Sequence, residues 1–465
     1  MNTINVVPDN WVVMPLGEAC KTVKGKKPKE SGSATAKRSV PYINIKAFES
    51  GQPAEFAQPG NYPKCEQGDV LIVWDGARAG LSGRAVPGYI GSTLAKIYSD
   101  KADNGYLFYF LQSQYGRVNG RTKGVGIPHV DPMIFNNIPF PIAPPDQQKR
   151  IVAEIEKQFS RLDEAVANLK RVKANLKRYK AAVLKAAVEG RLVETEASIA
   201  RREVRSYETG EQLLQRILES RRSQWKGKGK YKEPILPDTT NLFELPEGWV
   251  WASVGQISGL VEYGSSAKTR KDTTGVPVLR MGNIVDGELV FVELKYLPSG
   301  HDEFPKLLLQ PGDLLFNRTN SPELVGKTAV FAGSPMTCSF ASYLIRVRLV
   351  EGGAPKFLAS YINSLHGRNW VKSVVTQQVG QANVNGTKLQ ALAVPLPPEL
   401  EQQRIVMEID RRLTLIRETE SQIDVSLQRC ERERQSILER SFSGRIVYFR
   451  ANAASAANNQ LLVTL

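Results

Sequence analysis

The sequence predicts an α+β protein built from two strand-rich units, each followed by a long helix, and three observations support this prediction. The first is an internal repeat that covers most of the 465 residues. The second is a pair of long helical stretches with apolar residues at heptad spacing. The third is a series of short strand-like segments, broken by glycine and proline, upstream of each helical stretch. Together they indicate one structural unit that occurs twice.

The repeat is clearest at the two ends of each helical stretch. Pro144–Val152 (PPDQQKRIV) returns as Pro397–Val406 (PPELEQQRIV), and the stretches close alike with Val188–Val193 and Phe442–Val447. Arg150 and Arg404 near the start, and Gly190 and Gly444 near the end, are each 254 positions apart. A constant offset predicts two equivalent helices of equal length. Each run of about 40 residues would form a rod of roughly 60 Å at a rise of ~1.5 Å per residue.

Weaker matches extend the repeat through the two globular units in the same order. They indicate a shared framework with different contents. The matched pairs are Pro8–Val12 with Pro246–Val250, Val40–Ile45 with Val276–Met281, and Gly68–Ile72 with Gly312–Phe316.

Each globular unit reads as a strand-rich core with helical segments near its end, which makes it α+β. Val70–Trp74 and Ala341–Leu349 are typical of strands, whereas Gly105–Tyr115 and Pro355–Val374 favour helices. The expected division of the chain is 1–143 and 246–396 for the globular units, 144–193 and 397–447 for the long helices, 194–245 for a connector, and 448–465 for a disordered tail.

The two helical stretches carry matching apolar seams, which predict that the helices pack against each other. A stalk without any spacing role is the alternative that this pattern leaves open. The seam residues are Ile151, Ile155, Phe159, Leu162, Leu169, Leu176 and Val183 in the first stretch, and Ile405, Ile409, Leu413, Ile416, Ile423, Leu427 and Ile437 in the second.

Composition indicates a globular protein whose leading partner class is a polyanion. The formal charge is +15 and the pI is about 9.5, and a basic surface attracts phosphate groups. Many basic proteins simply stay soluble in this way, so the charge alone does not decide. No apolar run reaches the ~18 residues of a spanning helix and no leader pattern opens the chain, so we expect a cytoplasmic protein. Four scattered cysteines predict neither a disulfide framework nor a metal site.

The sequence lacks the motifs that would make the chain a catalyst by itself. It contains no GxxxxGK(S/T) for ATP phosphates and no Asn/Asp-Pro-Pro-Tyr/Phe of the kind that holds a flipped base. His129, His301 and His366 have no metal-ligand spacing and are interpreted as structural or surface residues. An endonuclease or a methyltransferase acting alone is therefore the disfavoured alternative, and we expect no catalytic residues.

Two dissimilar globular units, each followed by a matching helix introduced by Pro-Pro, an acidic residue, glutamine and Arg-Ile-Val, resemble the specificity subunit of Type I restriction-modification systems. The resemblance covers almost the whole chain. It implies two target recognition domains that each read one half of a bipartite, asymmetric site in double-stranded DNA. It also implies that the two helices form an antiparallel coiled coil that spaces the domains, with pseudo-twofold symmetry.

The same resemblance implies the partners. Two modification (methyltransferase) subunits would carry S-adenosylmethionine, and two restriction subunits would carry the ATP-dependent translocase and nuclease, with Mg²⁺. This chain itself is expected to bind no cofactor, no metal and no membrane. A coiled-coil scaffold that does not act on DNA is the alternative from another class, and it would show no specific, salt-dependent DNA binding.

DNA-contacting residues are predicted from side-chain chemistry, because Arg, Lys, Asn and Gln read base edges and basic residues hold phosphates. For any single lysine, a solvated surface position is an equally good interpretation. The candidates in the first unit are Lys24, Lys26, Lys27, Lys29, Lys37, Arg38, Arg78, Arg121 and Lys123. The candidates in the second unit are Lys268, Arg270, Lys271, Asn317, Arg318, Asn320, Gln378, Gln381 and Asn383.

The connector has no counterpart after the second helix. Glu211–Leu218 is predicted to form a short amphipathic helix, and Trp225–Lys232 a basic linker with aromatic ends. A strap that docks on another subunit or touches phosphates, and a solvated connector, are both compatible with this composition. Trp11 and Trp249 are expected to pack at the entrance of each globular unit rather than to stack on bases.

Overall fold

The computed structural model describes residues 7–124, 126–225, 229–271, 273–333, 336–378 and 381–444. The chain forms two compact units, of which unit 1 comprises Met1–Arg171 with Ile423–Leu465 and unit 2 comprises Val172–Gln422. Since the division crosses both long helices, each unit holds one globular part and a segment of each helix. The tail predicted to be disordered, 448–465, lies outside the described residues.

The globular part of unit 1 is α+β. Its strands are β1 Val12–Pro15, β2 Lys21–Lys24, β3 Ser31–Gly32, β4 Val40–Ile43, β5 Phe56–Ala57, β6 Lys64–Cys65, β7 Val70–Val73, β8 Ser82–Arg84, β9 Gly88–Ile90, β10 Leu94–Tyr98 and β11 Pro139–Ile142. Its helices are α1 Leu16–Ala19, α2 Ile45–Ser50, α3 Asn104–Ser113, α4 Tyr115–Asn119 and α5 Pro132–Asn136. An antiparallel four-stranded sheet, β2-β10-β7-β8, lies at the centre, beside a five-stranded sheet β3-β5-β4-β9-β6 and the pair β1-β11.

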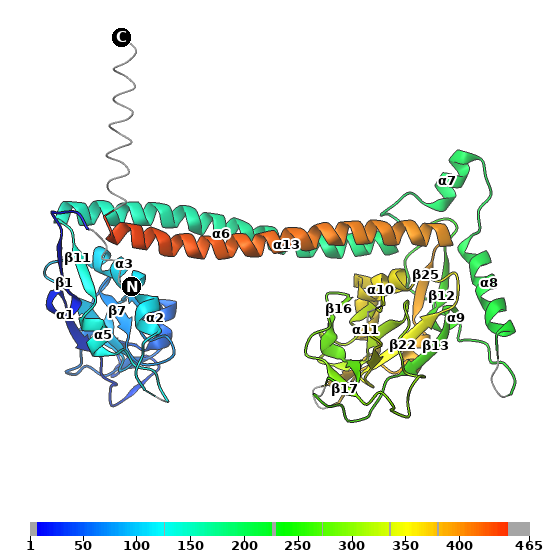
Figure 1. The fold of residues 1–465 in the computed structure, drawn as a ribbon, viewed down its shortest axis with the longest axis horizontal. Helices are drawn as coiled ribbons and strands as arrows, with labels where there is room; N and C mark the ends of the chain where they lie inside the picture. Colours follow the sequence, from blue (N-terminus) through cyan, green and yellow to red (C-terminus); the bar gives the residue numbers. More distant parts are fainter. Residues whose placement is uncertain are drawn as a thin grey trace, which may run out of the picture. The chain divides into compact units, whose positions relative to one another are not determined.

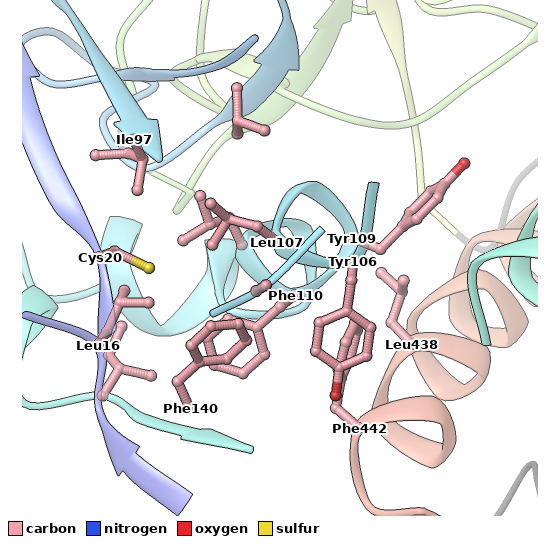
Figure 2. Packing of buried hydrophobic residues seen from close by; sticks show 14 of the residues in the cluster. Leu16, Cys20, Ile97, Tyr106, Leu107, Tyr109, Phe110, Phe140, Leu438 and Phe442 are labelled. Atoms are coloured by element: carbon pink, nitrogen blue, oxygen red, sulfur yellow. The ribbon is translucent and has the colours of Figure 1, made fainter. Parts of the chain in front are cut away.

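The core of unit 1 joins the four-stranded sheet to α3 and to the end of the second long helix, α13 (Glu399–Phe442). Figure 2 shows Phe442 of α13 facing Tyr106 and Phe110 of α3. The ring centroids lie 5.1 and 5.3 Å apart in edge-to-face contacts, a favoured aromatic geometry. The last turn of α13 is therefore part of the hydrophobic core of unit 1.

The globular part of unit 2 repeats this plan with longer insertions. Its strands are β12 Val250–Ser253, β13 Ser258–Tyr263, β14 Val276–Leu279, β15 Ile284–Val285, β16 Glu288–Leu289, β17 Lys295–Leu297, β18 Leu314–Asn317, β19 Thr319–Asn320, β20 Thr328–Val330, β21 Ser339–Phe340, β22 Leu344–Leu349, β23 Thr376–Gln378, β24 Gln381–Asn383 and β25 Ala393–Leu396. Its helices are α9 Val254–Ile257, η1 Met281–Asn283, α10 Pro355–Asn363, α11 Leu365–Val374 and α12 Gly386–Gln390. The single helix predicted over Pro355–Val374 is wrong, because extended backbone at Ser364 (ψ 172°) separates α10 from α11.

The two four-stranded sheets share their order and register, which confirms the internal repeat. The sheet of unit 2 runs β13-β22-β18-β20 and is antiparallel throughout. Lys96 of β10 lies opposite Leu71 of β7, and Arg346 of β22 lies opposite Leu315 of β18. In both units a helix that follows this sheet, α3 or α10, lies next to the pair of long helices (Figure 1).

A duplicated acid–base contact stabilises the start of the central strand. The Asp69 carboxylate lies 2.5 Å from Lys96 Nζ, and the buried Asp313 carboxylate lies 3.5 Å from Arg346 and 2.7 Å from Arg348. Asp313 is fully buried and Arg346 is 1% exposed. Burying either charge alone would cost several kcal/mol, so the pairing explains why both are tolerated.

The two long helices, α6 (Pro145–Val188) and α13, each contain 44 residues and begin and end at equivalent positions of the repeat. The prediction of two equal helices is therefore confirmed. Nine of the fourteen predicted seam residues are buried and the other five are half-buried. None of the described helices is both long and apolar enough to cross a membrane.

Contacts within each unit show that the helices run antiparallel. In unit 1, Arg434 of α13 pairs with Asp163 of α6, and its guanidinium lies 4.3 Å from the centroid of the Phe159 ring. In unit 2, Arg412 of α13 donates a hydrogen bond of 3.4 Å to the Tyr179 hydroxyl of α6. Since the residue numbers rise along one helix as they fall along the other, the pair is an antiparallel coiled coil (Figure 1).

The repeated glutamine at each helix start has a structural role. Gln148 Oε1 accepts the backbone amide of Asp103 at 2.8 Å, and its Nε2 donates to the carbonyl of Ala143 at 2.8 Å. Gln402 likewise accepts the amide of Ala354 at 2.9 Å and donates to the carbonyl of Pro397 at 2.9 Å. Both side chains are buried. Each long helix is thus hydrogen-bonded to the segment that leads into α3 or α10.

The two tryptophans pack as predicted. Trp11 and Trp249 are 6% and 8% exposed. Trp11 Nε1 donates to Gln147 at 2.8 Å, and Trp249 Nε1 donates to Glu401, the equivalent position, at 3.0 Å. Glu401 also accepts the backbone amide of Glu196 at 2.8 Å. A carboxylate has two acceptor oxygens, so one oxygen of Glu401 accepts from Trp249 and the other from the amide of Glu196. Burial of this carboxylate raises the pKa of Glu401.

The connector packs on unit 2 through two helices, α7 (Glu196–Glu203) and α8 (Gly210–Ser223). Leu213 and Ile217 are fully buried in the core of unit 2, and Arg221 donates to the carbonyl of Gln256 at 3.1 Å. The short helix predicted over Glu211–Leu218 is confirmed and is longer than expected. The interpretation of the connector as a solvated segment is wrong for α8, because Leu213 and Ile217 are buried. Residues 226–228 of the predicted basic linker lie outside the described part of the chain.

Candidate nucleic-acid interface

The candidate interface lies where the central strand of each main sheet ends. In unit 1, β7 is followed by Trp74 and Asp75, and the backbone of Asp75 pairs with that of His129. In unit 2, β18 leads through Arg318 into β19, whose Thr319 pairs with Asn383 of β24. In both units a distant loop therefore returns to the same strand end.

In unit 1 this return brings together basic and acidic side chains. The Asp75 carboxylate lies 3.1 Å from Lys24 Nζ and 2.7 Å from His129 Nδ1. Lys123, which pairs with His129 through the backbone, places its Nζ 3.1 Å from Asp131. Desolvation raises the pKa of Asp131, but hydrogen bonds from Lys123 and from backbone amides outweigh it and hold this pKa below its ordinary value. The cluster presents three basic side chains around two carboxylates.

In unit 2 the same return forms a small three-stranded sheet, β19-β24-β23. The Arg318 guanidinium lies 4.8 Å from the centroid of the Tyr263 ring, and its Nη2 donates to Asn383 Oδ1 at 3.4 Å. The Tyr263 hydroxyl accepts the backbone amide of Gly386 at 2.7 Å. Stacking and hydrogen bonding hold the planar guanidinium in one orientation, as recognition of a base edge or a phosphate requires.

The structure brings together part of the predicted set. In unit 1, Lys24 and Lys123 lie in the cluster around Asp75 and Asp131. In unit 2, Asn320 and Asn383 lie on the three-stranded sheet, and Arg318, directly before β19, contacts Asn383. Gln378 and Gln381 pair with each other through the backbone in the same sheet, and their side chains lie outside the described part of the chain.

Other predicted residues lie elsewhere in their units. Lys26, Lys27 and Lys29 occupy the exposed loop after β2, and Lys268, Arg270 and Lys271 occupy the loop after β13. Lys37 and Arg121 are exposed. Arg38 donates to the carbonyl of Ser33 at 3.2 Å, and Arg78 pairs with Glu49. None of the hydrogen bonds described for these residues reaches the cluster around Asp75 and Asp131 in unit 1 or the contact between Arg318 and Asn383 in unit 2.

Asn317 is a different case, because it has no exposed surface. Its Nδ2 donates to the carbonyl of Leu324 at 3.1 Å, and its backbone amide donates to the carbonyl of Lys327 at 2.9 Å. A side chain enclosed in this way stabilises the turn between β18 and β20. Asn317 therefore lies outside the candidate interface.

Four residues of the candidate interface were not among the residues predicted from the sequence: Asp75, His129, Tyr263 and Thr319. Two of them could have been found from their positions in the sequence, because Asp75 comes just after the apolar run of β7 and Thr319 comes directly after Arg318. His129 was interpreted as a structural or surface residue, and the structure agrees, since its side chain is 47% exposed and its ring contacts Asp75 at the strand end. Among the described residues, no group of three or more His, Cys, Asp or Glu could hold a metal ion.

Comparisons with known proteins agree with this architecture. The Type I restriction enzyme EcoKI specificity subunit of Escherichia coli (strain K12) is 22% identical over 462 residues, which cover 95% of this chain and 90% of that protein. The MjaVIII specificity subunit of Methanocaldococcus jannaschii is 24% identical over 328 residues, or 70% of this chain and 67% of that protein.

Two solved structures have the same fold. A chain from a structure that describes complex assembly and conformational transition of the type I R-M system aligns with a TM-score of 0.66 at 19% identity, over 94% of this chain and 99% of that one. The HsdS subunit from Thermoanaerobacter tengcongensis aligns with a TM-score of 0.52 at 19% identity, over 94% and 98%.

The family model described as "Type I restriction modification DNA specificity domain" matches residues 8–178 and 246–429. Each match contains one globular part and much of the long helix that follows it. The two matches together cover well over half of the chain, so this protein belongs to the Type I restriction-modification DNA specificity family.

Proposed function

We propose that this chain is the DNA sequence-specificity subunit of a Type I restriction-modification complex. Residues 1–143 and 246–396 are its two target recognition domains, and each reads one half of a bipartite, asymmetric site in double-stranded DNA. The observation that carries this proposal is the pair of equivalent strand ends, Asp75–His129 and Thr319–Asn383, which share backbone pairing but differ in side chains. Reading two different half-sites with one fold requires this combination.

The two long helices, residues 144–193 and 397–447, act as the spacer between the recognition domains. Their equal lengths and their hydrogen-bonded starts at Gln148 and Gln402 support this role. Phe442 packs in the core of unit 1, and Ile405 packs against the globular part of unit 2, so both joints would be stiff. A spacer with stiff joints would fix the number of base pairs between the two half-sites.

The exposed basic loops supply phosphate contacts. The loop after β2 carries Lys26, Lys27 and Lys29, and the loop after β13 carries Lys268, Arg270 and Lys271. Each phosphate that a protein neutralises lowers the slope of log affinity against log salt by about 0.9. The formal charge of +15 fits such a contribution.

Catalysis belongs to partner subunits. The curated relatives are named as specificity subunits of Type I restriction enzymes. By this likeness the partners of the present chain are two modification subunits with S-adenosylmethionine and two restriction subunits with ATP and Mg²⁺, acting on DNA in the cytoplasm. The chain directs their methylation and restriction and binds no cofactor itself.

The test is co-expression with a modification subunit from the same host, followed by mapping of methylated adenines across the host genome. We expect a bipartite motif with a fixed gap that disappears when this chain is omitted. Methylation at the same motif without this chain, or methylation by this chain alone, would refute the assignment.

A further inference from the structure

The structure assigns base selection to three equivalent positions of the two recognition domains: Lys24, Asp75 and His129 in unit 1, and Tyr263, Thr319 and Asn383 in unit 2. This inference rests on the proposed function and deepens it, because it names the side chains that distinguish one half-site from the other. The equivalence is one of backbone geometry, and the two sets share no residue type.

The first position is fixed by the edge strand of the main sheet. Lys24 pairs with Ala95, the residue before Lys96, and Tyr263 pairs with Ile345, the residue before Arg346. Since Lys96 and Arg346 are equivalent in the two sheets, Lys24 and Tyr263 are equivalent as well.

A glycine that follows each of these residues keeps the edge strand in place. A Cβ on Gly25 would lie 2.1 Å from the carbonyl oxygen of Gly91, and a Cβ on Gly264 would lie 2.3 Å from that of Phe340. Both distances are far below van der Waals contact, so only glycine permits this approach. The edge strand therefore leaves the sheet at the same point in both domains.

The other two positions are fixed by the returning loop. The amide of Val130 donates to the carbonyl of Trp74 at 2.8 Å, and the amide of Val384 donates to the carbonyl of Arg318 at 2.9 Å. These bonds hold the residues one step away, His129 beside Asp75 and Asn383 beside Thr319.

The helix that follows each loop adds a second restraint. Asp131 caps α5 by accepting the amide of Met133 at 2.9 Å, and Asn385 caps α12 by accepting the amide of Lys388 at 2.8 Å. Backbone on both sides of the loop is thus anchored in the same way. The side chains at 129 and 383 can differ without a change in the frame.

The side chains on this frame differ in the groups that they offer to DNA. In unit 1 the Asp75 carboxylate is flanked by the ammonium of Lys24 and the imidazole of His129. In unit 2 the Asn383 amide accepts from Arg318, which stacks on Tyr263. Carboxylate, amide and cationic groups select different donor and acceptor patterns in the major groove. The two domains therefore select different bases with the same backbone.

The partly exposed state of these side chains fits a reading role. The His129 and Lys24 side chains are 47% and 51% exposed, while the carboxylate that holds them is 17% exposed. A supported group with a free edge keeps its orientation and can still meet a base. The lysines of the neighbouring loop, such as Lys27, are exposed without such support and suit phosphates instead.

The experiment uses the complex of the full chain with its modification subunit, and it compares His129→Asn with Asn383→His. Methylated adenines are mapped across the host genome for each variant. His129→Asn should alter or relax only one half of the motif, with a loss of discrimination of about tenfold to a hundredfold at one or two positions. Asn383→His should do the same in the other half only, and the gap should stay constant in both.

Lys27→Ala is the comparison variant for a phosphate contact. It should weaken binding to all sequences alike and reduce the salt slope by about one, with the motif unchanged. Purified complexes incubated with a randomised DNA library, followed by sequencing of the bound fraction, give the same comparison when a variant methylates too weakly for genome mapping.

The outcomes separate this inference from the proposed function. An unchanged motif with both substitutions would overturn the inference and leave the specificity role standing. Loss of definition in both half-sites from one substitution would also overturn it, because the effect would then come from the fold. Absence of a bipartite motif with the wild-type chain would refute the proposed function itself.

Discussion

One buried glutamine at the start of each long helix joins the helix to the preceding globular part by hydrogen bonds. Gln148 joins the amide of Asp103 and the carbonyl of Ala143, two backbone groups that would otherwise lack these partners. The amide side chain is suited to this position because it offers one acceptor and two donors. This explains in physical terms why the glutamine occurs in both copies of the repeat.

We predict that Gln148→Ala lowers the free energy of unfolding of unit 1 by about 1–3 kcal/mol, because it leaves buried backbone groups without partners. The midpoint of thermal unfolding should fall by about 2–4 °C for each kcal/mol in a unit of this size. Lys149→Ala, at the adjacent exposed position, should leave the midpoint within error. Equal effects of the two substitutions would argue against the anchoring role.

A second prediction at this scale concerns Glu408 of α13. Hydrogen bonds from Arg411 and Arg412 lower its pKa from 4.5 to about 2. The folded state therefore disfavours the protonated acid, so the contribution is present above pH 4.5 and is lost as the pH falls toward 2. Glu408 and Arg412 are half-buried and Arg411 is exposed, so solvent screens the pairs and the contribution is small, about 0.5 kcal/mol for each pair.

Urea denaturation of the wild type and of Glu408→Gln should show this behaviour. The difference in unfolding free energy should be constant from pH 7 to pH 5 and should shrink below about pH 4.5. A difference that grows on acidification would contradict the assigned ion pairs.

The sequence pointed to candidate reading residues only where their chemistry is itself suggestive. Arg318 and Asn383 were predicted because arginine and asparagine are common base readers. His129 was not, because its contact with Asp75 joins residues 54 positions apart and no local spacing encodes it. Asn317 shows the opposite error, since its amide suits DNA but the fold encloses it completely.

At the scale of elements, sequence reasoning succeeded for the two long helices, where the two copies of the repeat match closely. The bounds of α6 and α13 agree because the same start and end signals occur twice. It failed at Ser364, where neither proline nor glycine marks the break between α10 and α11. It also failed to place the connector, because α8 has no second copy with which to compare its apolar face.

The position of α8 leads to a prediction. Leu213 is fully buried in the core of unit 2, so Leu213→Ala should remove about 2–5 kcal/mol of stability from that unit. Hydrogen exchange of the intact chain should then increase in β12 and α9, which α8 covers, while exchange in the core of unit 1 stays unchanged. Gln215→Ala, on the exposed face of the same helix, is the control. If β12 and α9 exchange in the Leu213→Ala variant at the same rate as in the wild type, the packing of α8 does not stabilise these two elements.

At the scale of the whole molecule, the coiled coil joins two globular parts that share a fold and differ in the residues at their equivalent strand ends. Its seam stays buried or half-buried at all fourteen predicted positions. The helix start is anchored by glutamine, and the last turn of α13 enters the core of unit 1. Because the helices are packed together and anchored in this way, their length would set the spacing of the half-sites.

Deleting one heptad from both helices, Leu169–Asn175 and Ile423–Arg429, tests this property. Seven residues correspond to about 10 Å of helix, and two turns preserve the facing of the seam. We expect the motif mapped from methylated adenines to keep both half-site sequences while its gap becomes shorter, by up to about three base pairs at 3.4 Å per step. Deleting Leu169–Asn175 alone leaves helices of unequal length and should reduce methylation without defining a new gap. An unchanged gap, or an altered half-site, in the double deletion would show that the helices do not measure the distance.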